Sequence, residues 1–216
     1  QSGKSSLRRA FLRNPFNEKH KPTFFSSYTS YVHVNDKSEF MDVWDTSESG
    51  CVAISALFFH AVILCLDLTN KNAIEMTKNS DWFKVIRSRY SHVPFVVVGC
   101  KLDAVPDCDE PLGKFVTEDF ATEELKGTYM ETSSKSGLAI MDVFNLAGTQ
   151  ALACPYNNFD TVDPYDRMIH HTTCYSNMKA TKTTSRHTKT SLSPKWFGWP
   201  AKSLQIASVW AKDVLK

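Results

Sequence analysis

Apolar and polar positions follow two different periods along residues 1–153, and together they predict alternating strands and helices. Residues 61–68 and 95–99 are continuous apolar runs, which are typical of strands buried on both faces. Residues 72–91 and 137–152 carry apolar positions at helical spacing. Alternating strands and helices build a mostly parallel sheet with helices on both faces, and we expect this α/β architecture here.

Weaker patterns complete the expected order of elements. Residues 5–14 predict a helix that ends near Pro15. Two extended runs between residues 31 and 44 flank the turn Asn35-Asp36-Lys37, which indicates an antiparallel hairpin. A short helix over residues 117–126 and a short strand over 129–132 precede the last helix. The pattern therefore predicts one domain over residues 1–153.

The pattern changes after this domain. Residues 155–200 are polar, rich in Thr, Ser and His, and interrupted by prolines, so we expect a poorly ordered tail. Residues 201–215 regain apolar positions at helical spacing, which predicts a terminal helix. Residues 154–216 are thus expected to form a basic, aromatic-containing C-terminal tail.

Charge is divided unevenly between these two parts. The net charge is +2, but residues 1–166 hold 16 Lys and Arg against 22 Asp and Glu, whereas residues 167–216 hold nine against one. One interpretation of the tail is an electrostatic anchor on anionic lipid, with Trp side chains at the interface. A solvated tail, or translated sequence from outside the original domain, is the alternative. Cations with aromatics also suit nucleic acid, but we expect no such partner.

The cysteines and the absence of targeting features indicate the cytoplasm. Six cysteines show no C-x-x-C pair and no metal-ligand spacing, which is consistent with reduced thiols. No secretory signal is visible, and no apolar run approaches the roughly 20 residues of a membrane span.

Candidate chemistry begins with Gly3-Lys4-Ser5, the end of the pattern G-x-x-x-x-G-K-[ST]. Backbone N–H groups at such a loop and the following helix hold phosphate oxygens. Thr23 lies 19 residues after Lys4 and Asp45 lies 41 after it. Taken singly, each residue has an ordinary alternative, such as a lysine at a helix start or an aspartate capping a turn.

Order and spacing together resemble the Rho family of Ras-superfamily small GTPases. The resemblance covers residues 1–153, about 70% of the chain. It implies a P-loop NTPase fold, a small G domain. The segments that carry it are Lys21-Pro22-Thr23-Phe24-Phe25-Ser26-Ser27-Tyr28, Val43-Trp44-Asp45-Thr46, Val98-Gly99-Cys100-Lys101-Leu102-Asp103, Glu131-Thr132-Ser133-Ser134-Lys135 and Val143-Phe144-Asn145-Leu146-Ala147.

The resemblance implies a role for each candidate residue in binding GTP or GDP with Mg²⁺. Lys4, following Gly3, would bridge the β- and γ-phosphates. The Ser5 and Thr23 hydroxyls would ligate Mg²⁺, and Asp45 would hold the ion through water. At the base, Asp103 would accept hydrogen bonds from guanine, and Lys101 would pack its stem over the ring. Ser134 would donate its backbone N–H to the guanine carbonyl, flanked by Ser133 and Lys135.

Departures from the family pattern bear on hydrolysis. Glu48 stands where the family has the glycine that contacts the γ-phosphate, and Ser49 stands where it has the glutamine that orients the attacking water. Cys100 replaces the asparagine that bridges the base and the phosphate loop. We predict weak or absent GTPase activity and identify no catalytic residue. The Rnd group of Rho relatives also lacks hydrolytic competence. A non-hydrolysing binding module or a truncated, non-functional fragment is the alternative.

The beginning and end of the chain and its surface give further expectations. The sequence opens at Gln1 inside the phosphate loop, so the first strand of the family fold is expected to be missing and a central sheet position to be empty. By resemblance, effectors and regulators would bind the switch I region at Phe24, Phe25 and Tyr28, in pathways of actin, polarity or trafficking. The last four residues are not a prenylation signal. We expect a cytoplasmic protein, peripheral at the inner face of the plasma membrane if the tail binds lipid.

Overall fold

The computed structural model describes residues 2–18, 25–46 and 59–154, together with the backbone of residues 204–210. A six-stranded sheet forms the centre, in the order β1-β2-β6-β3-β4-β5. The strands are β1 (Phe25–Val34), β2 (Lys37–Thr46), β3 (Ala61–Asp67), β4 (Phe95–Cys100), β5 (Thr128–Glu131) and β6 (Leu204–Trp210). Only the β1–β2 pair is antiparallel, and every other neighbouring pair is parallel. The expected mostly parallel sheet is therefore confirmed.

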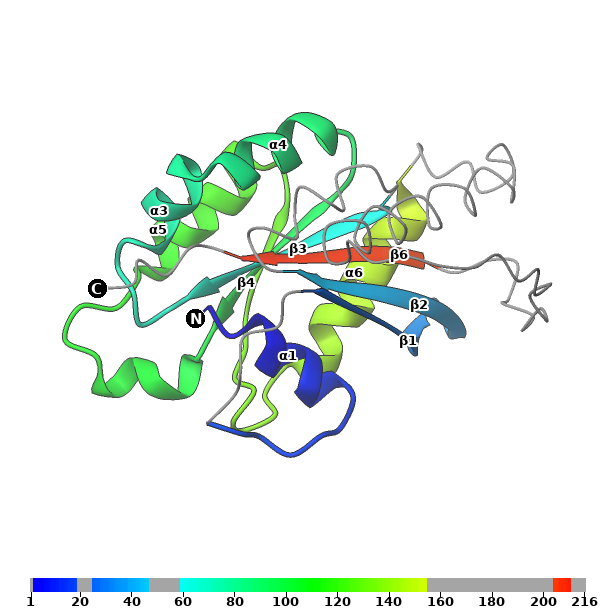
Figure 1. The fold of residues 1–216 in the computed structure, drawn as a ribbon, viewed down its shortest axis with the longest axis horizontal. Helices are drawn as coiled ribbons and strands as arrows, with labels where there is room; N and C mark the ends of the chain where they lie inside the picture. The colour runs from blue at the N-terminus through cyan, green and yellow to red at the C-terminus, as the bar shows by residue number, and fades with distance from the viewer. Residues whose placement is uncertain (1, 19–24, 47–58, 155–203, 211–216) are drawn as a thin grey trace, which may run out of the picture.

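Helices cover both faces of this sheet (Figure 1). They are α1 (Lys4–Phe11), α3 (Ala73–Asn79), α4 (Asp81–Arg89), the 3₁₀ helix η1 (Leu102–Asp107), α5 (Lys114–Asp119), the π-helical turn η2 (Phe120–Glu124) and α6 (Ile140–Ala153). Apolar residues of α1 and α6 pack against one face, and those of α3, α4 and η2 pack against the other. The predicted single helix over 72–91 is wrong, because Ser80 adopts an extended conformation and separates α3 from α4.

Successive side chains of the central strands belong alternately to two apolar cores, one on each face of the sheet. In β3, Val62, Leu64 and Leu66 belong to the core under α3 and α4, whereas Ile63 and Cys65 belong to the core under α1 and α6. All seven residues of β3 and all six of β4 are buried. Successive side chains of a strand point to opposite faces, so a strand covered on both faces is apolar along most of its length, and here only Asp67 at the end of β3 is charged. The predictions for these two runs are confirmed.

The hairpin is also confirmed, and it is longer than predicted. Asn35 and Asp36 both have positive φ, at 50° and 60°, which suits a two-residue turn that follows the twist of the strands. Alternation along β1 buries Val32 and Val34 against α6. Helix α6 approaches closely at Gly148, where an added Cβ would lie 2.9 Å from Val34 Cγ2. The hairpin is thereby fixed beside the central strands.

Strand β6 overturns two expectations. Residues 204–210 form a strand where a helix was predicted, and they lie between β2 and β3, the central position that was expected to be empty (Figure 1). The sequence Leu-Gln-Ile-Ala-Ser-Val-Trp is too short and too apolar for periodicity to separate a helix from a buried strand. Pairing with β2 and β3 gives the backbone N–H and C=O groups of this segment hydrogen-bond partners, and this tertiary contact makes it a strand instead of a helix.

The described helices include none long and apolar enough to cross a bilayer.

Candidate functional site

The carboxyl ends of the parallel strands meet at one edge of the sheet, and the candidate residues gather there. Asp45 lies at the end of β2, Asp67 ends β3, and Lys101 follows β4. Ser133 follows β5. Helix α1 begins at the same edge, because Lys4 in its first turn contacts Asp45. This edge is where open α/β sheets bind ligands.

At one end of the site, Asp45 joins the residues predicted to hold phosphate and Mg²⁺. The Lys4 ammonium forms an ion pair with Asp45 Oδ1. The Ser5 hydroxyl donates a hydrogen bond of 3.1 Å to Asp45 Oδ2, and Arg8 Nη1 lies 3.5 Å from the same oxygen. Asp45 is fully buried and Lys4 is 6% exposed. Two cations therefore share one buried carboxylate.

Gly3 sets the start of α1 at this end. Its φ of 90° lies in the left-handed region that favours glycine. An added Cβ would lie 2.8 Å from the Cβ of Cys100, so the loop packs directly against the end of β4. Ser2, just before it, is buried. Any larger residue at Gly3 would displace the loop that carries Lys4.

The opposite end of the site carries the residues predicted to recognise a base. The Ser133 hydroxyl donates to the Asp103 carboxylate, and Ser133 Oγ accepts from the backbone N–H of Ser136 at 3.1 Å. Lys101 has a left-handed φ of 66°, and its Nζ lies 2.6 Å from Asp67 Oδ2. These contacts fix η1 and the turn after β5 beside each other.

Cys100 lies between the two ends and is buried. The neighbouring Cys65 thiol and burial raise the pKa of Cys100 well above its usual value. Its Sγ lies 3.8 Å from the Val98 carbonyl oxygen, which accepts a weak hydrogen bond. The position at which the sequence predicts the loss of a bridging asparagine thus holds a neutral, inert thiol.

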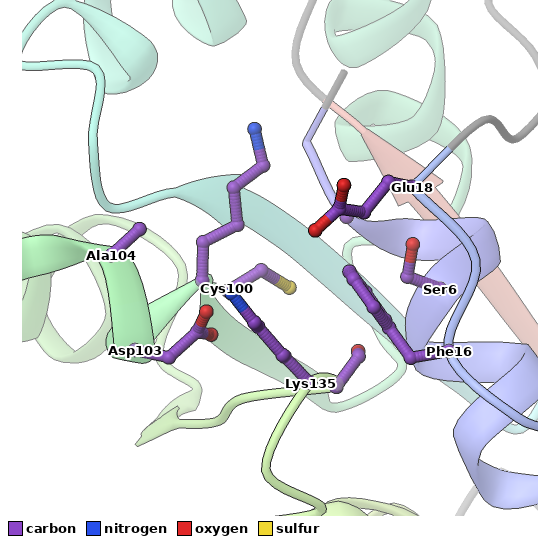
Figure 2. Close-up of a pocket in the computed structure, with 10 residues that line it drawn as sticks. Ser6, Phe16, Glu18, Cys100, Asp103, Ala104 and Lys135 are labelled. Atoms are coloured by element: carbon purple, nitrogen blue, oxygen red, sulfur yellow. The ribbon is translucent and has the colours of Figure 1, made fainter.

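A cavity of about 160 Å³ lies beside Asp103 and extends to Gly3 and Ser6 at the start of α1. Its lining includes Gly3, Ser6, Phe16, Glu18, Cys100, Lys101, Asp103, Ala104, Ser134 and Lys135. Figure 2 shows Phe16 and Glu18 on one side of this space and Asp103 with Ala104 on the other. Phe16 is 43% exposed, so its ring offers an apolar face that a planar ligand could cover.

Phe16, Glu18 and Arg8 were not among the predicted site residues. A single Phe after Pro15 within the polar stretch 13–18 was the only sequence feature that pointed to Phe16. Arg8 is 19% exposed and contacts both Asp45 and the hydroxyl of Ser26. Nothing in its helical spacing distinguished it from an ordinary surface arginine.

Oxygen ligands at the Asp45 end suit Mg²⁺. A hard divalent cation takes carboxylate, hydroxyl, phosphate and water oxygens, and Ser5 Oγ and Asp45 Oδ2 lie together there. Within the described part of the chain, no group of three or more His, Cys, Asp or Glu side chains could hold a metal ion by itself. Thr23, the other predicted ligand, lies outside the described residues, as do Glu48 and Ser49.

A family model supports the same assignment. The model described as "Ras family" matches residues 1–153, most of the chain. The chain belongs to the Ras family. It is a small GTPase with the α/β G-domain fold, a GTP- and GDP-binding switch.

Among curated relatives, several of the most similar are Rho-related. The Rho-related GTP-binding protein RhoD of Homo sapiens is 28% identical over 171 residues, covering 73% of this chain and 81% of the relative. The Ras-like GTP-binding protein RhoL of Drosophila melanogaster is 29% identical over 154 residues, covering 67% and 78%. RhoF of Mus musculus is 28% identical over 166 residues, covering 70% and 78%. The Ras-family protein is thus Rho-like.

One predicted surface residue of this Ras-family protein turns inward. Tyr28 shares the inner face of β1 with Val32 and Val34, because strand alternation places residues two apart on the same side. Its ring packs against Phe11, and Arg8 lies 5.9 Å from the ring centroid. Burial, followed by the Asp45 charge, raises its pKa well above the usual value. Tyr28 is therefore partly buried and packs against the core beside Asp45, and its predicted role in partner binding stays a prediction.

The other two residues predicted for partner binding cannot be placed in this way. Phe24 lies outside the described residues, and only the backbone of Phe25 is described, at the start of β1.

Proposed function

We propose that the protein binds GDP and GTP across the cavity between α1 and η1, with Mg²⁺ at the Asp45 end. The observation that carries this proposal is a cavity lined by Asp103, Ser134 and Lys135 that reaches Gly3 and Ser6 at the start of α1. Lys4 and Ser5, which follow Gly3, both contact Asp45. A carboxylate accepts hydrogen bonds from paired N–H donors, which selects guanine over adenine. Residues 1–153 would form this G domain, with residues 154–216 as a basic tail.

Each residue has a defined task in this proposal. Lys4 would leave Asp45 and take the phosphate oxygens, while the α1 N-terminus offers backbone N–H groups. Ser5, Thr23 and Asp45 would hold Mg²⁺, which neutralises phosphate charge. Lys101 stays anchored on Asp67, so its stem is fixed beside the base.

Lys135 and Ser134 line the cavity beside Asp103 and would complete the base site. Cys100 would contribute shape and no polar bridge, because its buried thiol is a weak hydrogen-bonding group.

We propose that GTP hydrolysis is weak or absent. Glu48 would bring a negative charge to the position of the γ-phosphate contact, and Ser49 is too short to orient water. A single-turnover assay tests this directly. We expect a lower rate for the wild type than for the variant Ser49→Gln combined with Glu48→Gly. A wild-type rate equal to that of ordinary Rho proteins would overturn this part.

A second function is favoured by one specific observation. Lys4 and Asp45 neutralise each other directly, and the cavity of about 160 Å³ is below the roughly 300 Å³ of common ligand pockets. A binding module that keeps the fold and uses no nucleotide would have such a closed site. Partners of this module would be proteins that bind around switch I at Phe24 and Phe25, with downstream roles in the cytoskeleton.

The tail suggests a location for either function. Residues 167–216 hold nine cations and one acid, and each cation near anionic lipid contributes up to about 1 kcal/mol. We propose peripheral binding to the inner face of the plasma membrane from the cytoplasm. Pelleting with vesicles of phosphatidylserine and phosphatidylcholine, compared with phosphatidylcholine alone, tests it. Equal pelleting in both would exclude an electrostatic anchor.

Titration with fluorescent GDP and GTP, with and without Mg²⁺, decides between the two functions. We expect guanine-selective, Mg²⁺-dependent binding that excess ATP does not displace. Asp103→Asn should weaken binding at least tenfold, whereas Asp107→Asn, an exposed aspartate in the same 3₁₀ helix, should not. A folded protein that binds neither nucleotide would establish the binding module.

A further inference from the structure

Strand β6 occupies a slot between β2 and β3 that the other described strands leave open. Residues Met41–Asp45 of β2 pair in parallel with Leu204–Ser208, and Ala61–Cys65 of β3 pair in parallel with Ile206–Trp210. β2 has β1 on its other side, and β3 has β4. Strands separated by one missing member lie about 9.6 Å apart, twice the spacing of neighbours, so β2 and β3 cannot pair directly. Figure 1 shows β6 filling this position.

The slot is lined by core on both faces. Met41, Val43 and Ile63 belong to the core under α1 and α6, while Val62 and Leu64 belong to the core under α3 and α4. An empty slot would leave a row of backbone N–H and C=O groups on both β2 and β3 without partners inside the protein. The slot therefore fits an extended, uncharged segment without proline that runs parallel to both neighbours.

The segment 204–210 has this chemistry. It carries no charge, no proline and no glycine, and Ile206, Val209 and Trp210 are residues that favour strands. Residues 155–203 connect it to α6, and the cost of closing so long a connection grows only with the logarithm of its length. Because the strand is tethered to the same chain, its effective concentration at the slot is set by the length of the connecting segment.

We propose that residues 204–210 are an inserted central strand whose docking completes both the sheet and the ligand site. The link to the site is Asp45, which pairs with Ser208 across the β2–β6 ladder and whose side chain holds Lys4 and Ser5. Withdrawal of β6 frees the backbone at Asp45 and loosens the residues it holds. Only this link to nucleotide affinity rests on the proposed function; the docking itself does not.

Disulfide trapping in the full chain tests the docking and its register. Cys65 is the partner of Trp210, and neighbouring strand residues have Cα atoms within the 4.4–6.8 Å range that a disulfide spans. We expect Trp210→Cys to form a disulfide with Cys65 upon oxidation, identified by peptide mass mapping. The control Val209→Cys, one residue earlier and paired with Leu64 instead of Cys65, should link at least tenfold less.

The outcomes of the trapping experiment separate the alternatives. A mixture of isotope-labelled and unlabelled protein shows whether the link lies within one chain. Intrachain links specific to position 210 support the proposal. Links between two chains would assign the slot to a second copy and overturn insertion within the chain. Equal linking at 209 and 210, or none at either, would overturn the docking altogether.

A proline pair tests the coupling to the site. Ala207→Pro removes a ladder donor in a central strand, whereas Ala180→Pro makes the same change in the connecting segment. We expect Ala207→Pro to lower the melting midpoint by at least about 5 °C and the nucleotide affinity at least tenfold, with Ala180→Pro like the wild type. Equal behaviour of the two variants would overturn the proposal. If the wild type binds no nucleotide while the Cys65 link forms, the proposed function fails and the inserted strand stands.

Discussion

The shared carboxylate of Asp45 makes a prediction about stability in the absence of ligand. Asp45→Asn removes the negative charge that neutralises Lys4 and Arg8, both within ion-pair distance of it. Removing one partner of a buried ion pair costs about 3–5 kcal/mol, because the other charge stays in the interior. Arg8 is 19% exposed and retains some water, so we expect about 3 kcal/mol. For a domain of this size, that corresponds to a melting midpoint lower by about 6–12 °C.

Lys4→Met should cost less than Asp45→Asn. Asp45 then keeps the Ser5 hydroxyl and the Arg8 guanidinium, so the carboxylate stays hydrogen-bonded and paired. We expect about 1.5–2 kcal/mol, the lower part of the range of about 1.5–3 kcal/mol for one hydrogen bond to a charged group. The double variant should be about as stable as Asp45→Asn alone, because the lone lysine charge is gone. The coupling energy between the two positions is then about 1.5–2 kcal/mol.

Urea unfolding in EDTA, without nucleotide, measures these differences. The matched control is Asp81→Asn, which removes an exposed pair with Lys84 and should cost less than about 0.5 kcal/mol. The reasoning would be refuted if Asp45→Asn unfolded within about 0.5 kcal/mol of the wild type. Additive effects of the two single changes would refute the direct pairing itself.

Three further predictions concern the cavity and its neighbours. Phe16→Ala should weaken nucleotide binding by about 5–100-fold, the range of aromatic–base stacking, with little change in melting because the ring is 43% exposed; fluorescence titration and thermal unfolding measure the two effects. The Cys65 thiol and burial raise the pKa of Cys100, so it should resist iodoacetamide at pH 8.5 in the folded protein and react in urea. Because the folded thiol holds its proton longer than the unfolded one, its contribution to stability declines as the pH rises above about 8.5. Arg8→Leu should increase the ratio of the nucleotide affinity in Mg²⁺ to the affinity in EDTA, because Arg8 is the second cation beside Asp45. The control is Arg9→Leu, which should leave this ratio unchanged, since Arg9 donates to the Pro15 carbonyl at 3.1 Å.

Much of the sheet could be predicted because its strands are buried on both faces. The apolar runs that became β3 and β4 had to be strands in the interior of a parallel sheet, and the hairpin followed from its turn residues. The break at Ser80 was not predictable from apolar spacing, since both halves keep an inner face in the same core. β6 was missed because a seven-residue segment with five apolar side chains fits a helix or a strand, and only the open slot decides.

The site residues that could be predicted are those whose positions follow from the order of the strands along the chain. Lys4, Asp45 and Asp103 converge because the ends of parallel strands meet at one edge of the sheet. Phe16 carries no periodic pattern, and its role depends on a loop that folds back over the cavity. The resemblance described a ligand-bound site, so it gave each side chain a ligand and could not show the direct pairing of Lys4 with Asp45.

The charges at Asp45 connect ligand binding to the stability of the fold. In the proposed function, phosphate would take Lys4, so the buried carboxylate would lose its nearest cation and a negative phosphate would arrive close to it. The buried carboxylate stays stable there only if another positive charge replaces Lys4. Two replacements are available: Mg²⁺ held beside Ser5, or the Arg8 guanidinium, which lies 3.5 Å from Asp45 Oδ2. Arg8 can therefore stand in part for the metal. β6 pairs with Asp45 through the backbone, so the Lys4 ion pair and the inserted strand both stabilise this residue. In the proposed function, nucleotide binding would replace the Lys4 ion pair while the pairing with β6 is kept.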